Sequence, residues 1–540
     1  MTSGYFGRKR DGAPAFISAC TLMLLTVWVV PASATAAIPY REAFRPQLHF
    51  SPLAHWMNDP CGMVYYNGEY HLFYQYHPVG THWGPMHWGH AISKDLVHWR
   101  HLPVALYPDK LGAIFSGSAV VDLANTSGLG TRTRPPMVAV FAYHDHAIER
   151  RGGVKVETIG IAYSLDRGRT WSKYRGNPVL PNPGIRNFRD PKVFWMASAH
   201  KWIMTLAVKD HVSFYSSGDL KAWRYESDFG QDIGEHHGVW ECPDLVPMKV
   251  AGEDREYFTL IVSVNPGAPN GGSGIQYFVG QFDGHRFRLE DRLDPQDGPG
   301  AVPRQPRWLD FGTDDYAGVT WSGLGPSDGR ILFLGWMSNW DYAAKVPTKV
   351  WRGAMTLPRE LRLVHSDHGL EVRSLPVAEL DSLRGRDFPI APAKVGRPVE
   401  LLKNSKTSSQ FEIELAIRPA DSDIITLVLS NSLQEKVEFR VNRPAKHYEL
   451  DRTYSGISDF SHGFGSLQTA PLEGIADPLK LHIYVDQSSV EIFINDGKWV
   501  FTDLVFPHEG YNSILLSADK EIQVISGAVH ELKSIWDERP

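Results

Sequence analysis

Ser93-Lys94-Asp95-Leu96-Val97-His98-Trp99 is the first of three related turns that decide the fold. The second is Ser164-Leu165-Asp166 with Trp171 behind it, and the third is Ser217-Gly218-Asp219 with Trp223. Their aspartates lie 71 and then 53 residues apart. A short Ser or Asp side chain can close a turn on its own backbone, while the Trp anchors the turn to a sheet. A recurrence every roughly 50 to 70 residues matches the four-stranded units of a β-propeller.

Short β-like runs surround these turns from about residue 45 to residue 365, and no long helical period interrupts them. Asn67-Gly68 predicts a tight hairpin turn between two such runs. About 320 residues at this spacing predict about five blades. Chance recurrence of common turn residues is the alternative, because the three copies are short and unevenly spaced. The clearest runs are residues 62–66, 69–76, 137–141 and 331–336.

The C-terminal part begins with a predicted linker over residues 366–390. It contains a short helix, with Ser374 as its cap, Pro376 early in its first turn and Gly385 at its end. The rest, residues 391–540, alternates again between apolar and polar positions, as in residues 411–417, 481–485 and 490–494. Such evenly spaced antiparallel strands fit a β-sandwich. The predicted fold is therefore all-β, with a five-bladed β-propeller at 45–365 followed by a C-terminal β-sandwich.

The N-terminus predicts an export signal over residues 1–36. Basic residues 8–10 precede a mostly apolar run at 15–30, and small residues at 31–36 offer cleavage sites. The apolar run is shorter than the roughly 20 residues that a membrane-spanning helix needs. A lipoprotein signal at Cys20 fits less well, because most of the apolar run follows that residue. We expect a secreted protein, extracellular or periplasmic, without membrane attachment once the signal is removed.

Composition narrows the function further. The net charge of −6 is mild and no basic run follows the N-terminus, so no nucleic-acid partner is expected. The 17 Trp, 21 Tyr and 25 Phe suit both β-structure and ring stacking. Cys61 and Cys242 remain after the signal, which excludes a disulfide-stapled scaffold. We expect two small packing residues, with a disulfide between them as the lesser alternative. The sequence does not determine the oligomeric state.

Three acidic residues stand just ahead of prolines in stretches rich in aromatic and polar side chains. They are Asp59 in the segment 55–60, Asp190 in 188–191 and Glu241 in 240–243. Because proline favours extended backbone in the preceding residue, we expect Asp59 and Asp190 to be held extended. Aromatic faces pack on sugar rings, and two acids can break a glycosidic bond. Each acid alone could be a turn former, but together they predict a carbohydrate enzyme.

These motifs resemble those of glycoside hydrolase family 32, and within it the exo-acting levanases and inulinases. The resemblance runs from about His49 to the C-terminus and implies the same propeller and sandwich. It implies a retaining hydrolase that releases terminal fructose from β-fructans (levan, inulin), and also cleaves sucrose, through a covalent fructosyl-enzyme. Asp59 matches the family's nucleophile, Glu241 its acid/base and Asp190 its transition-state stabiliser.

Electrostatic arguments agree with these roles for Asp59, Glu241 and Asp190. A retaining mechanism brings nucleophile and acid so close that both cannot ionise freely. We therefore expect a raised pKa that keeps Glu241 protonated, and an Arg189 that helps to keep Asp190 ionised.

The resemblance also implies which side chains contact sugar. Cys61 departs from the family pattern, which usually has Asn there, and it adjoins the nucleophile without replacing a catalytic group. Which of the two late tryptophans faces the sugar stays open. The implied binding residues are Trp56, Asn58, Gln75, Trp83, Phe115, Ser116, Arg189, Trp336 and Trp340.

Alternative functions are compatible with the same motifs. A fructosyltransferase on the same scaffold and a non-catalytic fructan-binding protein share these motifs, while a sialidase-like propeller would need a cluster of arginines. His82, His87 and His90 could suggest a metal, but a strand places the first two on opposite faces and no carboxylate or thiol completes a set. No metal or organic cofactor is expected, because paired carboxyls suffice for the chemistry.

Overall fold

The computed structural model of this chain describes residues 40–290, 306–324, 329–402 and 409–536. The expected export signal, residues 1–36, lies outside them. Within the described residues, the helices are α1 (His146–Arg150), η1 (Ala197–Ala199) and η2 (Ala378–Leu383), and all other regular elements are strands. None of these helices is long and apolar enough to cross a membrane.

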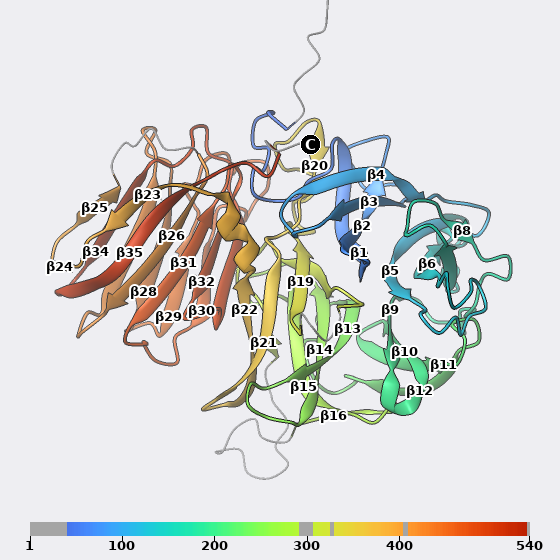
Figure 1. Cartoon of the computed structure of the whole chain (residues 1–540). Coiled ribbons are helices and arrows are strands. Elements are labelled where there is room, and N and C mark those ends of the chain that lie inside the picture. Colours follow the sequence, from blue (N-terminus) through green and yellow to red (C-terminus); the bar gives the residue numbers. More distant parts are fainter. Residues whose placement is uncertain (1–39, 291–305, 325–328, 403–408, 537–540) are drawn as a thin grey trace, which may run out of the picture. The chain divides into compact units, whose positions relative to one another are not determined.

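The five blades of a β-propeller follow one another along the chain (Figure 1). The first contains β1 (His55–Tyr66), β2 (Glu69–His77), β3 (His87–Ser93) and β4 (Trp99–Leu106), with β20 (Trp351–Arg352) parallel to β1. The second contains β5 (Ala113–Val121), β6 (Met137–His144), β7 (Glu157–Ser164) and β8 (Ser172–Lys173). The third contains β9 (Phe188–Met196), β10 (Lys201–Val208), β11 (His211–Ser217) and β12 (Arg224–Phe229).

Two further blades complete the ring. The fourth contains β13 (Val239–Lys249), β14 (Glu256–Asn265), β15 (Gly274–Phe282) and β16 (Phe287–Leu289), with β17 (Arg307–Trp308) on β15. The fifth contains β18 (Tyr316–Thr320), β19 (Ile331–Trp336), β21 (Arg359–Ser366) and β22 (Gly369–Pro376). The inner strands β1, β5, β9, β13 and β18 each contact the next, and β18 contacts β1, so the ring closes. The predicted five-bladed propeller is confirmed.

The repeated turns occupy the same place in three successive blades, between the third strand and the fourth. In each, the aspartate carboxylate accepts hydrogen bonds from backbone amides of the turn, as Asp95 does from Val97 and His98 at 3.0 and 2.8 Å. The indole of the following tryptophan donates to a turn carbonyl, as Trp99 does to Leu96 at 3.0 Å. The recurrence in the sequence is therefore one turn per blade rather than chance.

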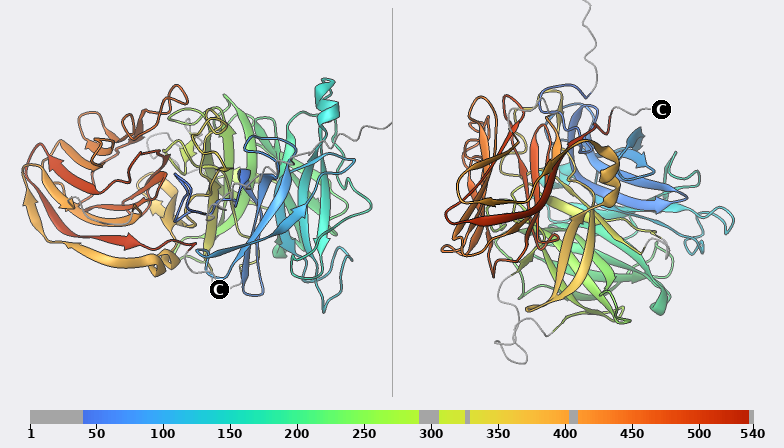
Figure 2. Two further views of the ribbon diagram at one scale, coloured as in Figure 1. Left: turned by 90° about the horizontal axis from the view of Figure 1, so that it is seen from above. Right: turned by 60° about the vertical axis from the view of Figure 1, so that its left-hand side comes forward.

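The C-terminal part is a sandwich of two sheets (Figure 2). One sheet contains β23 (Arg384–Ile390), β35 (Ile522–Leu532), β26 (Phe411–Arg418), β31 (Leu479–Val485), β32 (Ser489–Ile494) and β33 (Trp499–Leu504), with β24 (Ala393–Val395) on β35. The other contains β25 (Val399–Leu402), β34 (Ser513–Ala518), β27 (Ile424–Ser430), β28 (Lys436–Asn442), β29 (His447–Asp451) and β30 (Leu467–Pro471). Their apolar inner faces form one core, as the alternating patterns predict.

The linker helix differs from its prediction. Helix η2 is a single 3₁₀ segment. Val377 occupies its N-cap position, and no side chain caps the helix. Ser374 and Pro376 belong to β22 and Gly385 to β23, because pairing of β22 with β21 continues to Pro376. Sheet pairing thus overrides the local capping pattern.

Buried charges join the propeller to the sandwich. Arg359, at the start of β21, is fully buried and donates to Asp310 and Asp315 at 3.0 Å, and to Glu491 of β32 at 2.7 Å. On the same contact surface, Gly312 lies against the backbone of Thr502, where a Cβ would come within 2.2 Å of the backbone N and O. Arg452 adds a second buried cation to this contact, 2.7 Å from Asp314 and 3.2 Å from Asp503, so the contact depends on buried arginines that each pair with several carboxylates.

Replacing Arg359 by Ala is expected to lower the free energy of unfolding by about 3–5 kcal/mol, because it leaves buried carboxylates without their partner. Urea unfolding at neutral pH measures the change. Arg288→Ala is the control: it removes an exposed ion pair with Asp283 and should change stability by no more than about 1 kcal/mol. Equal effects of the two substitutions would contradict this account of the contact.

Candidate active site

Each inner strand of the propeller is irregular at one functional side chain. The register of β1, β5, β13 and β18 against their neighbours shifts at Asp59, Ser116, Glu241 and Tyr316, and that of β9 shifts at Asp190. A β-bulge bends its strand and redirects the side chain at that point. At these bulges the five inner strands thus supply five polar side chains from segments far apart in the sequence.

Backbone conformation at these bulges contradicts one expectation. Asp190 was expected to be extended because Pro191 follows it, but its φ is +58°. Cys242, which precedes Pro243, has a φ of +48°, and Ala317 has +53°. The bulges impose this left-handed backbone, and each such residue costs about 1–3 kcal/mol, which the surrounding sheets must offset.

Asp59 is held by contacts from three blades. Its Oδ2 accepts a hydrogen bond of 2.7 Å from Ser116 on β5, and its Oδ1 accepts one of 2.8 Å from Asn58. Trp56 in turn donates from Nε1 to Asn58 at 2.8 Å, so the amide is oriented toward the acid. The thiol of Cys242 lies 3.8 Å from Asp59 Oδ2. The carboxylate is thereby fixed in place while its residue keeps partial solvent exposure.

Glu241 has two strong donors. Arg189 contacts its Oε1 through two nitrogens, at 2.7 and 3.2 Å, and the Tyr316 hydroxyl donates to Oε2. Arg189 lies farther from Asp190, with its closest nitrogen 3.9 Å from that carboxylate, and its charge lowers the pKa of Asp190 as expected. The bulge turns Asp190 toward the amide of Cys242, which donates to it at 3.2 Å.

The carboxyl groups are close enough to perturb one another. Burial, followed by repulsion from Glu241, raises the pKa of Asp59 above its usual range, against the lowering effect of Ser116 and Asn58. Burial also raises the pKa of Asp190 to about 7, where Glu241 and Asp59 add to the rise and Arg189 opposes it. The three acids that the sequence singled out therefore lie in one electrostatic cluster.

The predicted aromatic residues fall into two sets. Trp83 is 41% exposed, and its ring meets that of Phe115 edge-on at 5.9 Å, so these two rings can present surface to a ligand. Trp340 keeps partial exposure and stacks on Trp56 at 6.0 Å. Trp56 and Trp336 are fully buried, which places both behind the ligand-facing surface rather than on it. Of the two late tryptophans, Trp340 is the one that reaches solvent.

Gln75 and the cysteines support the site from behind. The Gln75 amide, almost fully buried, donates to the Ile114 carbonyl at 3.1 Å and interacts with the Cys61 thiol. Cys61 and Cys242 are both buried and free, so no disulfide joins them. Burial raises the pKa of both thiols well above the usual value, which keeps them protonated beside the acids.

Tyr316 and Glu157 are site residues that the sequence did not reveal. Tyr316 lies in Asp314-Asp315-Tyr316, which has no distinctive local pattern, and Glu157 opens an ordinary strand. Glu157 Oε1 lies 3.6 Å from an Arg189 nitrogen. Both residues reach the site through the packing of neighbouring blades, which no local sequence signal encodes.

Family models match almost the whole described chain. Residues 49–374 match the N-terminal domain of glycosyl hydrolases family 32, and residues 379–534 match the C-terminal domain of the same family. The chain belongs to glycosyl hydrolase family 32. It is a glycoside hydrolase, as the paired acids predicted. The family resemblance noted in the sequence is confirmed.

Family 32 relatives span both domains. The chain is 46% identical to a levanase of Bacillus subtilis, over 96% of this chain and 74% of the relative. It is 34% identical to an invertase of Schizosaccharomyces pombe, over 92% and 87% of the two chains. The crystal structure of exo-inulinase from Aspergillus awamori superimposes with a TM-score of 0.83 at 33% identity, and covers 92% of this chain and all of that one.

Asp190→Asn is expected to stabilise the fold at pH 7 and above while abolishing activity. Because the folded pKa exceeds the ordinary value, the ionised carboxylate opposes folding; this penalty is complete above about pH 7 and fades as the pH falls toward 4. The amide lacks the penalty, so the gain should reach about 2–4 kcal/mol at pH 8 and vanish near pH 4. Urea unfolding across this pH range measures it; an equal gain at both ends would refute the role of ionisation.

Proposed function

We propose that this glycoside hydrolase is a secreted, exo-acting β-fructofuranosidase. It releases terminal fructose from levan or inulin, and also cleaves sucrose, with retention through a covalent fructosyl-enzyme. The observation that carries the proposal is the convergence of Asp59, Asp190 and Glu241 from three blades. The names of the levanase, exo-inulinase and invertase relatives support the substrate class. Secretion rests on the export pattern of residues 1–36.

The first step of the proposed reaction forms a bond to Asp59. Its carboxylate attacks the anomeric carbon of the terminal fructosyl unit while Glu241 gives a proton to the leaving oxygen, so the glycosidic bond breaks. Ser116 and Asn58 hold the nucleophile in position for this attack. Asp190 accepts hydrogen bonds from sugar hydroxyls and stabilises the positive charge that develops on the ring.

The second step returns the enzyme to its starting state. Glu241 removes a proton from water, the water oxygen attacks the anomeric carbon, and the bond to Asp59 breaks as fructose leaves. Arg189 and Tyr316 hold Glu241 from both oxygens, so the same carboxyl can serve as acid and then as base without moving.

Fructose should be the first and main product from levan, inulin and sucrose, as a time course of products would measure. Asp59→Ala should lower hydrolysis by about 10⁴-fold or more while the fold is retained, because no other group can form the glycosyl bond. Activity near the parent level in this variant would refute the assignment. Fructan oligomers of growing length from concentrated sucrose would favour a transferase instead, and binding of fructan without turnover by the parent enzyme would favour a binding protein.

Glu241→Ala should affect substrates according to their leaving group. Protonation matters most when the leaving oxygen is basic, so kcat/KM for sucrose should fall by about 10²–10⁴-fold and that for an aryl fructoside much less. Steady-state kinetics on both substrates measures the difference. The matched control is Glu371→Ala, a β22 carboxylate away from the acid cluster, which should leave the ratio of the two kcat/KM values unchanged. Equal losses of kcat/KM on both substrates in Glu241→Ala would show that Glu241 is not the general acid.

A further inference from the structure

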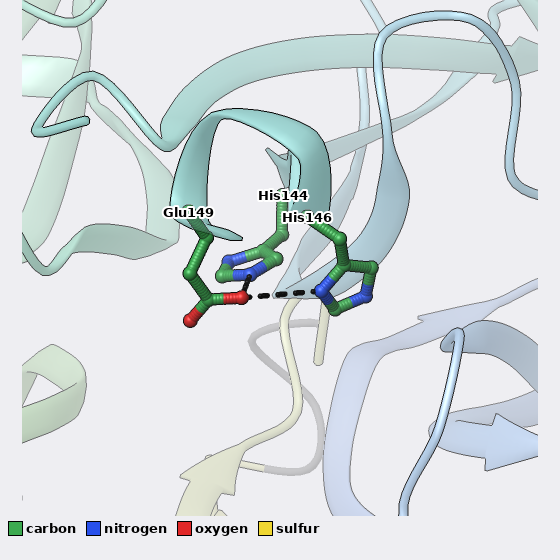
Figure 3. Close-up of side chains that lie close together, drawn as sticks. All are labelled: His144, His146 and Glu149. Carbon is green, nitrogen blue, oxygen red and sulfur yellow. Dashed lines mark hydrogen bonds and ion pairs between the residues drawn. The ribbon is translucent and has the colours of Figure 1, made fainter. Parts of the chain in front are cut away.

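A compact group of two histidines and a glutamate lies at the end of β6 and in helix α1. His144, His146 and Glu149 fall within six residues, and their side chains point toward one another (Figure 3). Their ligand atoms all lie within 4.8 Å of one another. This group shares no residue with the His82, His87 and His90 set considered from the sequence, in which His90 bonds instead to His71 at 3.0 Å.

The distances match those around a tetrahedral ion. Glu149 Oε2 lies 3.0 Å from His144 Nε2 and 3.3 Å from His146 Nδ1. With metal–ligand bonds of about 2.0–2.1 Å, neighbouring ligands of a tetrahedral zinc ion lie roughly 3.3–3.4 Å apart. Movements of a few tenths of an ångström would therefore give two imidazoles and one carboxylate a shared ion, with the fourth position open to water.

An outer carboxylate completes the pattern. His144 Nδ1, the ring nitrogen that would not bind the ion, lies 3.5 Å from Glu157 Oε1. Both side chains are about 95% buried, and neither His144 Nδ1 nor Glu157 Oε2 has a hydrogen-bond partner in the described part of the chain. Ligating histidines commonly donate their second N–H to a carboxylate, which fixes the tautomer and the ring orientation. An ion bound to Nε2 of His144 would leave the proton of the ring on Nδ1, where it could be donated to Glu157.

A second group with ligand spacing, Glu412, Glu414 and His482, provides a comparison. There Arg384 already donates to Glu412 at 2.7 and 2.6 Å, so a metal would compete with a bound cation. Among the described residues, Glu149 has no such arginine or lysine partner and pairs with the two histidines alone. The α1 group is thus the one with a free site for positive charge.

We propose that His144, His146 and Glu149 bind one divalent transition-metal ion of the Zn²⁺ class, with Glu157 as the outer partner of His144. The donor set of two imidazoles and one carboxylate suits zinc rather than Mg²⁺ or Ca²⁺, which require more oxygen ligands. The ion takes no part in bond cleavage. It ties α1, through His146 and Glu149, to His144 at the end of β6. The ring of His144 in turn stacks on Phe115 at 4.2 Å.

Equilibrium dialysis of the metal-stripped full chain against Zn²⁺ tests the proposal. The parent protein should bind one tight equivalent, and Mg²⁺ should not compete. His146→Ala and Glu149→Gln should each weaken binding by at least about 100-fold, since removal of an outer partner alone costs roughly 10–100-fold. Glu149 is 52% exposed and His146 25%, so both variants should fold. Glu157→Gln should weaken binding by about 10-fold.

His482→Ala is the matched control, because it removes a histidine from the competing group and should leave zinc binding unchanged. Cobalt substitution gives an independent readout, since Co²⁺ in the parent should show the strong visible absorption of a tetrahedral site, and Glu149→Gln should lose it. Parent-like zinc binding in His146→Ala and Glu149→Gln, or no stoichiometric zinc binding by the parent, would overturn the proposal. Both readouts are independent of fructan hydrolysis, so they stand or fall separately from the proposed function.

Discussion

Repulsion among buried carboxylates is the constraint on which this molecule depends. Asp59, Asp190 and Glu241 lie close enough to raise the pKa of the first two, in a region where burial already disfavours charge. On its own, a cluster of this kind opposes folding. It persists because the five inner strands close into a ring, so no blade can move its acid away without breaking contact with both neighbours.

The donors around the cluster show how the protein limits that repulsion. Arg189 and Tyr316 both contact Glu241, whereas Asp59 receives the neutral donors Ser116 and Asn58. Arg189 contacts Glu241 and opposes the rise in the pKa of Asp190, whereas among the described residues no cation contacts Asp59. In the proposed mechanism the adjacent carboxyls supply both a proton and a nucleophile, and pairing every acid with a cation would leave no proton to give.

Much of the fold and of the candidate site could be predicted from the sequence, because the sequence signals are local and each has a physical mechanism. The Ser-x-Asp turns recur since each closes on its own backbone amides, and the period of these turns gives the blades. The acids stand out because of their neighbours along the chain. Local signals fail where sheet pairing and contacts between neighbouring blades decide. Pro191 predicts extended backbone at Asp190, but the bulge imposes a positive φ, and Tyr316 has no pattern of its own. Likewise Arg189 adjoins Asp190 in sequence but contacts Glu241 across the blade boundary.

The domain contact and the acid cluster both gather carboxylates, but they differ in how deeply these groups are buried. At the contact between the domains, Arg359 donates to Asp310, Asp315 and Glu491, all of which are almost fully buried. That arrangement fixes the position of β21 but leaves no reactive group. On the inner strands the carboxyls outnumber the cations, and Asp59 and Glu241 both retain exposure to solvent. Carboxylates therefore outnumber cations at both places, and the acid cluster differs in that two of its carboxyls reach solvent, where a substrate could contact them.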